Sequence, residues 1–194
     1  MQIMLVLDHP VSASFCGALA DAVTQGARDA GHGIDFLDLA RDDFGCLFQP
    51  EDRDYFLGGA VPDDVAAMHA RVAAADALVF VYPIYWWTFP ARLRGWIDRV
   101  FTAGWAYAME AGGNRPLLRS RPTALIASAG AGRQTIEEFG YGAAMRRLID
   151  EGTFGYCGLT SIHPLLVPDV HESAESRAAG LAAARALPRT LLAS

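Results

Sequence analysis

Three large aromatic side chains, Tyr85, Trp86 and Trp87, stand together in one short segment, PIYWWTFP, residues 83–90. The segment follows an uninterrupted apolar run, ALVFVY, residues 77–82. Rings of this size are costly to expose, and a planar group such as the isoalloxazine of a flavin would cover them, while backbone N–H groups at its edge would stabilise negative charge. The other interpretation is that Trp86 and Trp87 pack in the core or at a dimer contact.

A second candidate is the loop from His9 to Cys16, which leads directly into a stretch with helical character. The free N–H groups at the start of a helix, and the positive end of its dipole, suit a phosphate group. Hydroxyl groups of Ser12 and Ser14 would add donors. GxGxxG and GxxxxGK[ST] are both missing, which excludes a Rossmann dinucleotide site and a P-loop. The alternative is that Ser12 or Ser14 only caps the helix.

The third candidate is the segment SAGAG, from Ser128 to Gly132, which follows another apolar run. Small residues allow a backbone to approach a flat ligand closely, although the same residues also form ordinary turns. The segment gains weight because it shares one sheet edge with the first two loops.

Other kinds of catalytic site find no support in this sequence. The 5 histidines show neither HExxH nor a paired metal spacing, and no loop contains the GxSxG pattern of a hydrolase. The 3 cysteines are widely spaced and lack a CxxC pair, so neither a disulfide framework nor a zinc site is indicated. Hydrolase and metalloenzyme interpretations are therefore set aside.

Strand and helix patterns alternate along the whole chain and position these loops. Strands are expected at 2–8, 33–39, 77–82, 123–128 and 159–167, helices at 14–30, 63–74, 91–102, 137–149 and 173–192, and an irregular stretch over 41–62. Right-handed crossovers then predict an α/β fold in which helices cover both faces of a parallel sheet. A doubly wound five-stranded sheet of this kind is flavodoxin-like, with strand order 2-1-3-4-5, and it binds ligands at the carboxyl ends of its strands. We expect residues 1–194 to form a single domain that binds flavin.

Composition limits the class of partner. The formal net charge of −6 supplies no basic surface for nucleic acid or an anionic membrane, so a small-molecule substrate is expected instead. No apolar run approaches the length of a membrane span, and the N-terminal residues lack the pattern of a signal peptide. A cytoplasmic location is expected.

The block Gly95-Trp96-Ile97-Asp98-Arg99-Val100-Phe101, which follows PIYWWTFP closely, carries a specific resemblance. It resembles the NAD(P)H:quinone oxidoreductase (DT-diaphorase) family, including the quinone-reductase-like ancillary subunits of bacterial potassium-efflux systems. Weaker matches extend the likeness over nearly the whole chain, at His9-Pro10, Ser14-Phe15, Ala75-Asp76, GWAY (104–107) and YCGL (156–159).

The resemblance implies a homodimeric flavoprotein that takes hydride from NADH or NADPH and passes two electrons to a quinone. It implies a substrate pocket lined by Trp87 and Tyr107, with Tyr107 reaching across the dimer. Arg177 looks like the family arginine near the adenine of FAD, which favours FAD over FMN. The implied flavin-binding residues are His9, Ser14, Phe15, Cys16, Pro83, Ile84, Tyr85, Trp86, Trp87, Ser128, Ala129, Gly130, Ala131 and Arg177.

The sequence departs from the family pattern at three places. Ser128–Ala131 stands where the family has Thr-Thr-Gly-Gly, and Cys16 stands where it has asparagine. The tyrosine and histidine of the animal enzymes have no clear counterpart, but Tyr141 falls near the place of the histidine and is the candidate catalytic residue. With a phenol pKa near 10, it would act as a hydrogen-bond donor.

Two alternatives remain open at this point. One is an azo-, nitro- or tailoring reductase on the same scaffold, because the flavin supplies the chemistry and the pocket selects the acceptor. The other is a regulatory subunit whose flavin and nucleotide occupancy controls a membrane-transporter partner.

Overall fold

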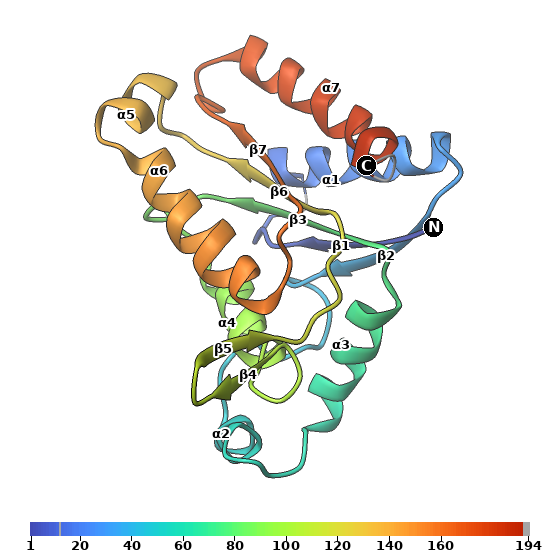
Figure 1. The fold of residues 1–194 in the computed structure, drawn as a ribbon. Helices are drawn as coiled ribbons and strands as arrows, with labels where there is room; N and C mark the ends of the chain where they lie inside the picture. Colours follow the sequence, from blue (N-terminus) through green and yellow to red (C-terminus); the bar gives the residue numbers. More distant parts are fainter. Residues whose placement is uncertain (12, 192–194) are drawn as a thin grey trace.

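A parallel sheet forms the centre of the molecule in the computed structural model, which describes residues 1–11 and 13–191. Its strands are β1 (Gln2–Leu7), β2 (Gly33–Asp38), β3 (Ala77–Pro83), β6 (Thr123–Ser128) and β7 (Ile162–Val167). They lie side by side in the order β2-β1-β3-β6-β7, and every neighbouring pair is parallel (Figure 1). Counted along the chain, this is the order 2-1-3-4-5, so the predicted flavodoxin-like α/β fold is confirmed.

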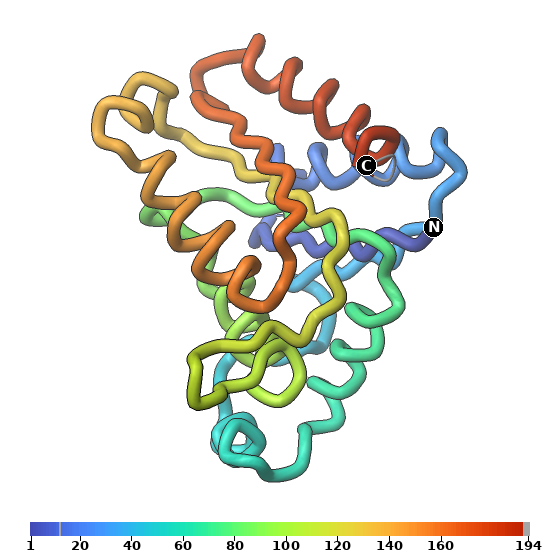
Figure 2. Tube along the Cα trace, in the orientation of Figure 1, coloured from blue at the N-terminus to red at the C-terminus, as the bar shows by residue number. Residues whose placement is uncertain are grey.

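Alternation along the strands separates two apolar layers. Ile3, Leu5 and Val79 face a layer formed with α1 (Phe15–Asp29) and α7 (Ala174–Leu191). Residues of the opposite parity in β1 and β3 face a second layer, formed with α3 (Asp63–Ala74) and α4 (Ala91–Val100). Figures 1 and 2 show α1 and α7 together on one side of the sheet and α3 and α4 on the other. All 7 residues of β3 are buried, as the central position of the strand requires.

The prediction of one continuous helix at 137–149 is wrong in its extent. The segment divides into α5 (Arg133–Glu138), α6 (Tyr141–Met145), the π-helix η1 (Arg146–Phe154) and the short 3₁₀ helix η2 (Gly155–Cys157). Gly140 separates α5 from α6 with a φ of 69°, in the left-handed region where glycine has no steric penalty.

Two further elements were not expected from the sequence. The stretch 41–62 was predicted to be irregular but contains α2 (Pro50–Phe56), and β4 (Tyr107–Glu110) pairs with β5 (Gly113–Pro116) in an antiparallel hairpin. Within residues 1–11 and 13–191, none of the helices combines the length and the hydropathy needed to span a bilayer. The cytoplasmic location stays a prediction.

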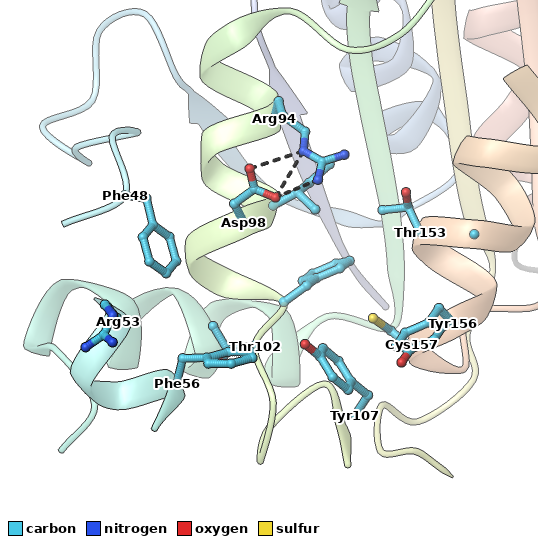
Figure 3. A pocket seen from close by; sticks show the side chains of 13 residues that line it. Phe48, Arg53, Phe56, Arg94, Asp98, Thr102, Tyr107, Thr153, Tyr156 and Cys157 are labelled. Atoms are coloured by element: carbon cyan, nitrogen blue, oxygen red, sulfur yellow. Dashed lines mark hydrogen bonds and ion pairs between the residues drawn. The ribbon is translucent and has the colours of Figure 1, made fainter. Parts of the chain in front are cut away.

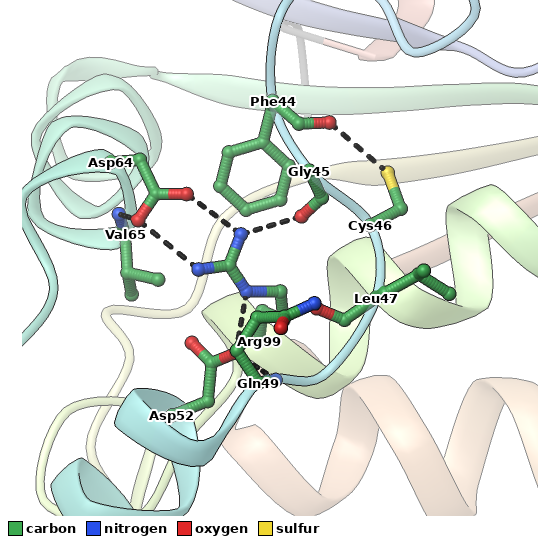
Figure 4. Close-up of polar contacts among 9 residues, drawn as sticks. All are labelled: Phe44, Gly45, Cys46, Leu47, Gln49, Asp52, Asp64, Val65 and Arg99. Atoms are coloured by element: carbon green, nitrogen blue, oxygen red, sulfur yellow. Dashed lines mark hydrogen bonds and ion pairs between the residues drawn. The ribbon is translucent and has the colours of Figure 1, made fainter.

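The stretch 41–62 is held to the rest of the domain by Arg99 of α4, a residue that is 4% exposed (Figure 4). Arg99 Nε donates to Asp52 Oδ2 of α2 at 2.8 Å, and Nη1 donates to Asp64 Oδ2 of α3 at 2.7 Å. Nη1 also donates to the carbonyl of Gly45. We call this group, Arg99 with Asp52, Asp64 and Gly45, the Arg99 clamp.

Candidate active site

The three loops singled out from the sequence meet at the carboxyl edge of the sheet. One cavity of about 430 Å³ lies between the loop after β1, the end of β3 and the start of the loop after β6. A second, of about 220 Å³, adjoins it and is lined by Ile84, Trp86, Trp87 and Ala129–Ala131. The two cavities share Ile84 and Gly130. We call them together the cleft.

The turn at Trp86 and Trp87 has an unusual backbone. Both residues have positive φ, 49° and 63°, and Tyr85 and Thr88 on either side exchange two backbone hydrogen bonds. This is the geometry of a two-residue hairpin turn that normally selects asparagine and glycine, and each bulky residue held there costs about 1–2 kcal/mol. In the described part of the chain, the N–H groups of Trp86 and Trp87 have no hydrogen-bond partner. Strain of this kind concentrates at functional sites.

The two tryptophans differ in their surroundings. Trp86 is 92% exposed, so the interpretation that it packs in the core is wrong. Trp87 is half-buried, and its ring stacks on that of Tyr141, with centroids 3.7 Å apart and planes 13° apart. Phe139 stacks in turn on Tyr141 at 5.8 Å. Tyr141 therefore lies behind one wall of the cleft, although its catalytic role stays a prediction.

Residues of the first loop combine structural and lining roles. Ser14 Oγ accepts a hydrogen bond from the N–H of Gly17 at 3.1 Å, so Ser14 caps α1 and also lines the cleft. Ser12 lies outside the described residues. His9 lines the cleft as well, and its Nδ1 lies 3.1 Å from the N–H of Val11, which donates to it.

Cys16 joins the first loop to the third. Its Sγ lies 3.2 Å from Ser128 Oγ, and both side chains are buried at the cleft. Burial raises the pKa of the Cys16 thiol to about 11, and Asp8 adds to the shift although the Ser128 hydroxyl opposes it. The thiol is therefore neutral at physiological pH and serves as a packing and hydrogen-bonding group rather than as a nucleophile.

Besides Tyr141, two predicted residues lie away from the cleft lining. Arg177 donates from Nη1 to the carbonyl of Val170 at 2.8 Å, which holds the loop that carries Val170 and His171 against the first cavity. Tyr107 lines a different cavity of about 460 Å³, with Phe48, Phe56 and Tyr156 (Figure 3). Burial raises the pKa of Tyr107, and Tyr156 and Cys157 add to the shift. Within one chain, Tyr107 and Trp87 therefore do not share a pocket.

Sequence reasoning missed Asp8 and the loop at 170–171. Asp8 follows β1 and is 1% exposed; its carboxylate accepts from Arg92 Nε and from the N–H of Leu93, each at 2.9 Å. Asp8 thus caps the first turn of α4, although it lies far from α4 in sequence. The acidic residue after an apolar run was the available signal, but nothing in the sequence identified its partner. No sequence signal singled out Val170 or His171.

The cleft has a shape that suits a flat cofactor. A Cβ at Gly130 would come within 2.9 Å of His171 Cδ2, so a larger residue there would narrow the cleft or displace the exposed His171 ring. Ala129 and Ala131 on either side keep the strip small, and the unpaired N–H groups of the tryptophan turn offer donors. The start of α1 at the other cavity offers further free N–H groups. The residues present therefore fit a planar group with a phosphate tail.

Comparison with known proteins agrees with this architecture. A family model described as flavodoxin-like fold matches residues 1–190. An uncharacterized NAD(P)H oxidoreductase of Haemophilus influenzae is 30% identical over 88% of this chain and 85% of that protein. NAD(P)H dehydrogenase [quinone] 1 of Rattus norvegicus is 26% identical over 84% of this chain and 67% of its own length.

Solved structures show the same similarity. The NAD(P)H:quinone oxidoreductase from Methanothermobacter marburgensis superimposes with a TM-score of 0.92 and 30% identity, covering 98% of each chain. The fold, the cleft and these relatives agree with the resemblance carried by residues 95–101. The chain therefore belongs to the flavodoxin-like family that contains the NAD(P)H:quinone oxidoreductases.

Proposed function

We propose that this protein is a flavin-dependent oxidoreductase that carries two electrons from NADH or NADPH to a quinone or a similar aromatic acceptor. The observation that carries the proposal is the strained turn at Trp86 and Trp87, which presents two unpaired N–H groups beside the small residues Ala129–Ala131. Backbone strain of this kind clusters at active sites and ligand-binding segments. Relatives named as NAD(P)H oxidoreductases and quinone reductases support the same activity.

Each wall of the cleft has a separate task under this proposal. The start of α1, with His9, Ser14, Phe15 and Cys16, would hold the phosphate end of the cofactor. Pro83 to Trp87 and Ser128 to Ala131 would flank its ring and ribityl chain. Bound flavin would supply the chemistry, accepting hydride from the nicotinamide and returning two electrons to the acceptor. The protein's own contribution is proximity and stacking geometry.

Tyr141 and Tyr107 have proposed roles in acceptor binding. Tyr141, stacked on Trp87, would donate a hydrogen bond to an acceptor oxygen and help to exclude water. Tyr107 lies at another cavity of the same chain, so it would line an acceptor site only if two chains form a homodimer and it reaches the partner's cleft. Sedimentation giving only monomers would remove this role for Tyr107.

Either FAD or FMN is compatible with the proposal. The expected preference for FAD relies on Arg177, whose guanidinium bonds to the carbonyl of Val170 at the rim of the first cavity. One solved relative, general stress protein 14 of Treponema denticola, is 25% identical and is described as a complex with FMN. Chromatography of the flavin released by denaturation decides between the two cofactors.

The decisive experiment is an anaerobic titration of the flavin-loaded protein. NADH or NADPH should bleach the visible flavin band, and a simple benzoquinone should restore it. A flavin band that neither nucleotide bleaches would contradict the oxidoreductase proposal. It would favour the regulatory alternative, in which occupancy of the cofactor site controls a membrane-transporter partner.

A matched pair of glycine variants tests the position of the cofactor. Gly130→Val should fold but lose flavin, because its side chain would occupy the open strip beside His171. Gly112→Ala is the control, because a Cβ there meets nothing within 4 Å. Equal flavin content in the two variants would place the cofactor elsewhere.

A further inference from the structure

A third cavity lies on the other side of Ile84 from the cleft. It has a volume of about 260 Å³ and lies between β3, β6 and β7 of the sheet and the helices α6 and η1, which cover that face (Figure 1). Ile84 is the one residue that it shares with the lining of the cleft. It therefore adjoins the proposed cofactor site without belonging to it.

Much of the lining of this cavity is apolar, and its volume is large enough for a small ring compound. Leu125, Ala127, Ile149 and Leu166 are among the apolar residues that line it, and Pro164 of the edge strand β7, which also lines it, is exposed. An apolar cavity of about 150 Å³ is enough to bind benzene. The volume here suits a molecule of one or two rings.

Two polar groups at this cavity have no hydrogen-bond partner among the described residues. The Tyr82 side chain is 2% exposed, and its hydroxyl makes no hydrogen bond with any residue that the structure describes. The half-buried Asp150 carboxylate likewise accepts no hydrogen bond from the described residues. Neither group is completely enclosed by protein, so both open onto the cavity, where a ligand with a hydroxyl group can pair with them.

Burial acts on both groups in the same direction. It raises the pKa of Asp150, although the nearby Arg146 guanidinium opposes the shift. It also raises the pKa of Tyr82, and the charge of Asp150 adds to that effect. Tyr82 is therefore a neutral phenol, able to donate or to accept, while Asp150 can only accept when ionised.

The helix that carries Asp150 is itself unusual. Arg146–Phe154 is a π-helix of 9 residues, and π-helical turns are rare and occur frequently at functional sites. Ile149 and Asp150 both lie in this helix and both line the cavity. The wider turn thus presents one apolar and one acidic side chain to the same space.

We propose that this cavity binds a neutral phenol of one or two rings. The ring would fill the apolar body, and its hydroxyl would donate to Asp150 while Tyr82 pairs with an oxygen of the ligand. Arg146 also lines the cavity and balances the charge of Asp150, which favours a neutral ligand over an ammonium ion or a carboxylate. The site is separate from the proposed hydride relay and does not depend on it.

The test uses 2-naphthol, which is neutral, fluorescent and unable to accept hydride. Its binding to the purified protein, saturated with FMN and without nucleotide, is measured by calorimetry and by naphthol fluorescence. We expect one site per chain. Asp150→Leu should weaken binding about tenfold or more, because a hydrogen bond to a charged group is lost. Ala127→Leu should abolish binding by filling the cavity.

The matched control is Glu151→Gln. Glu151 is the adjacent carboxylate on the same helix, but it pairs with Arg147 and does not line this cavity. Its replacement should leave 2-naphthol affinity unchanged. Urea unfolding of all variants checks that they fold, and Asp150→Leu removes a carboxylate that burial disfavours, so it should not unfold the protein.

Two outcomes would overturn the proposal. They are no binding at millimolar 2-naphthol and binding that Ala127→Leu leaves intact. In the second case, loss of binding in Gly130→Val would assign the ligand to the cleft. None of these measurements uses NADH or NADPH. Failure here is therefore distinguishable from failure of the proposed oxidoreductase activity.

Discussion

The turn at Trp86 and Trp87 lies next to α4 in sequence, since α4 begins at Ala91. The turn is strained and exposed, whereas α4 contains buried and well-paired side chains. The turn holds two bulky residues at positive φ and leaves Trp86 almost fully exposed. In α4, Trp96 is fully buried and Arg99 is buried with two carboxylate partners. The block at 95–101, which is the most recognisable part of the sequence, therefore stabilises the fold, whereas the strained loops before it form the cleft.

Removing the guanidinium of the Arg99 clamp should have the largest effect on stability. Arg99→Met leaves Asp52, itself 1% exposed, as an uncompensated buried charge, and we expect a loss of about 3–5 kcal/mol in the free energy of unfolding. Arg94→Met on the same helix breaks only the exposed pair with Asp98 and should cost less than about 1 kcal/mol. Urea denaturation measures both, and similar losses in the two variants would refute the structural role of the clamp.

Gly95→Ala should have the next largest effect. A Cβ at this position would lie 1.7 Å from the carbonyl oxygen of Cys46, so α4 and the 41–62 stretch must separate. We expect a loss of about 2–3 kcal/mol from overpacking. Gly112→Ala, where a Cβ has free space, is the control. A change in flavin affinity at unchanged stability would show that this region belongs to the cleft after all.

A substitution in the strained turn should raise the free energy of unfolding rather than lower it. Trp86→Asn places a residue that tolerates positive φ in an exposed position, and we expect a gain of about 0.5–1 kcal/mol in the free energy of unfolding. Trp86→Ala should give no such gain, because alanine has the same steric penalty as tryptophan there. If thermal unfolding shows that Trp86→Asn destabilises the protein, the Trp86 ring itself contributes to the fold.

The smallest expected effect on the free energy of unfolding comes from protonation of Asp64 in the Arg99 clamp. Burial raises the pKa of Asp64, but the hydrogen bonds and charge of Arg99 outweigh it and hold the pKa below its ordinary value. A depressed pKa contributes stability above the ordinary value of about 4 and loses it as the pH falls through the folded-state pKa. Because the Asp64 side chain is 45% exposed, the contribution should stay below about 1 kcal/mol.

Urea unfolding from about pH 5 to about pH 3 measures this contribution as the difference between wild type and Asp64→Asn. The wild type should lose its advantage as the pH falls. A constant difference across the range would show that Asp64 is not stabilised by Arg99. Carboxylates away from Arg99 titrate equally in both proteins, so they cancel from the comparison.

The sequence predicts the sheet and the meeting of the three loops because apolar runs and helical spacing are local signals. It does not predict the break at Gly140, because an isolated glycine costs a helix only about 1 kcal/mol and does not by itself end one. Nor does it predict the sign of φ at Trp86 and Trp87, since propensity disfavours the conformation adopted. The separation of Tyr107 from Trp87 depends on long-range packing around Phe48 and Tyr156, which has no local signature.

Asp8 links the cleft region to the helix α4. Its backbone lies between the end of β1 and the loop that lines the cleft, while its carboxylate caps the helix that carries Arg99. The exposed Trp86 side chain can be changed with little effect on the fold, whereas a substitution at Asp8 would disturb the start of α4 directly. Tolerance to substitution is thus unequal around the cleft: Asp8, which looks like an ordinary strand end, is a position where a change near the cleft is also a change in the fold.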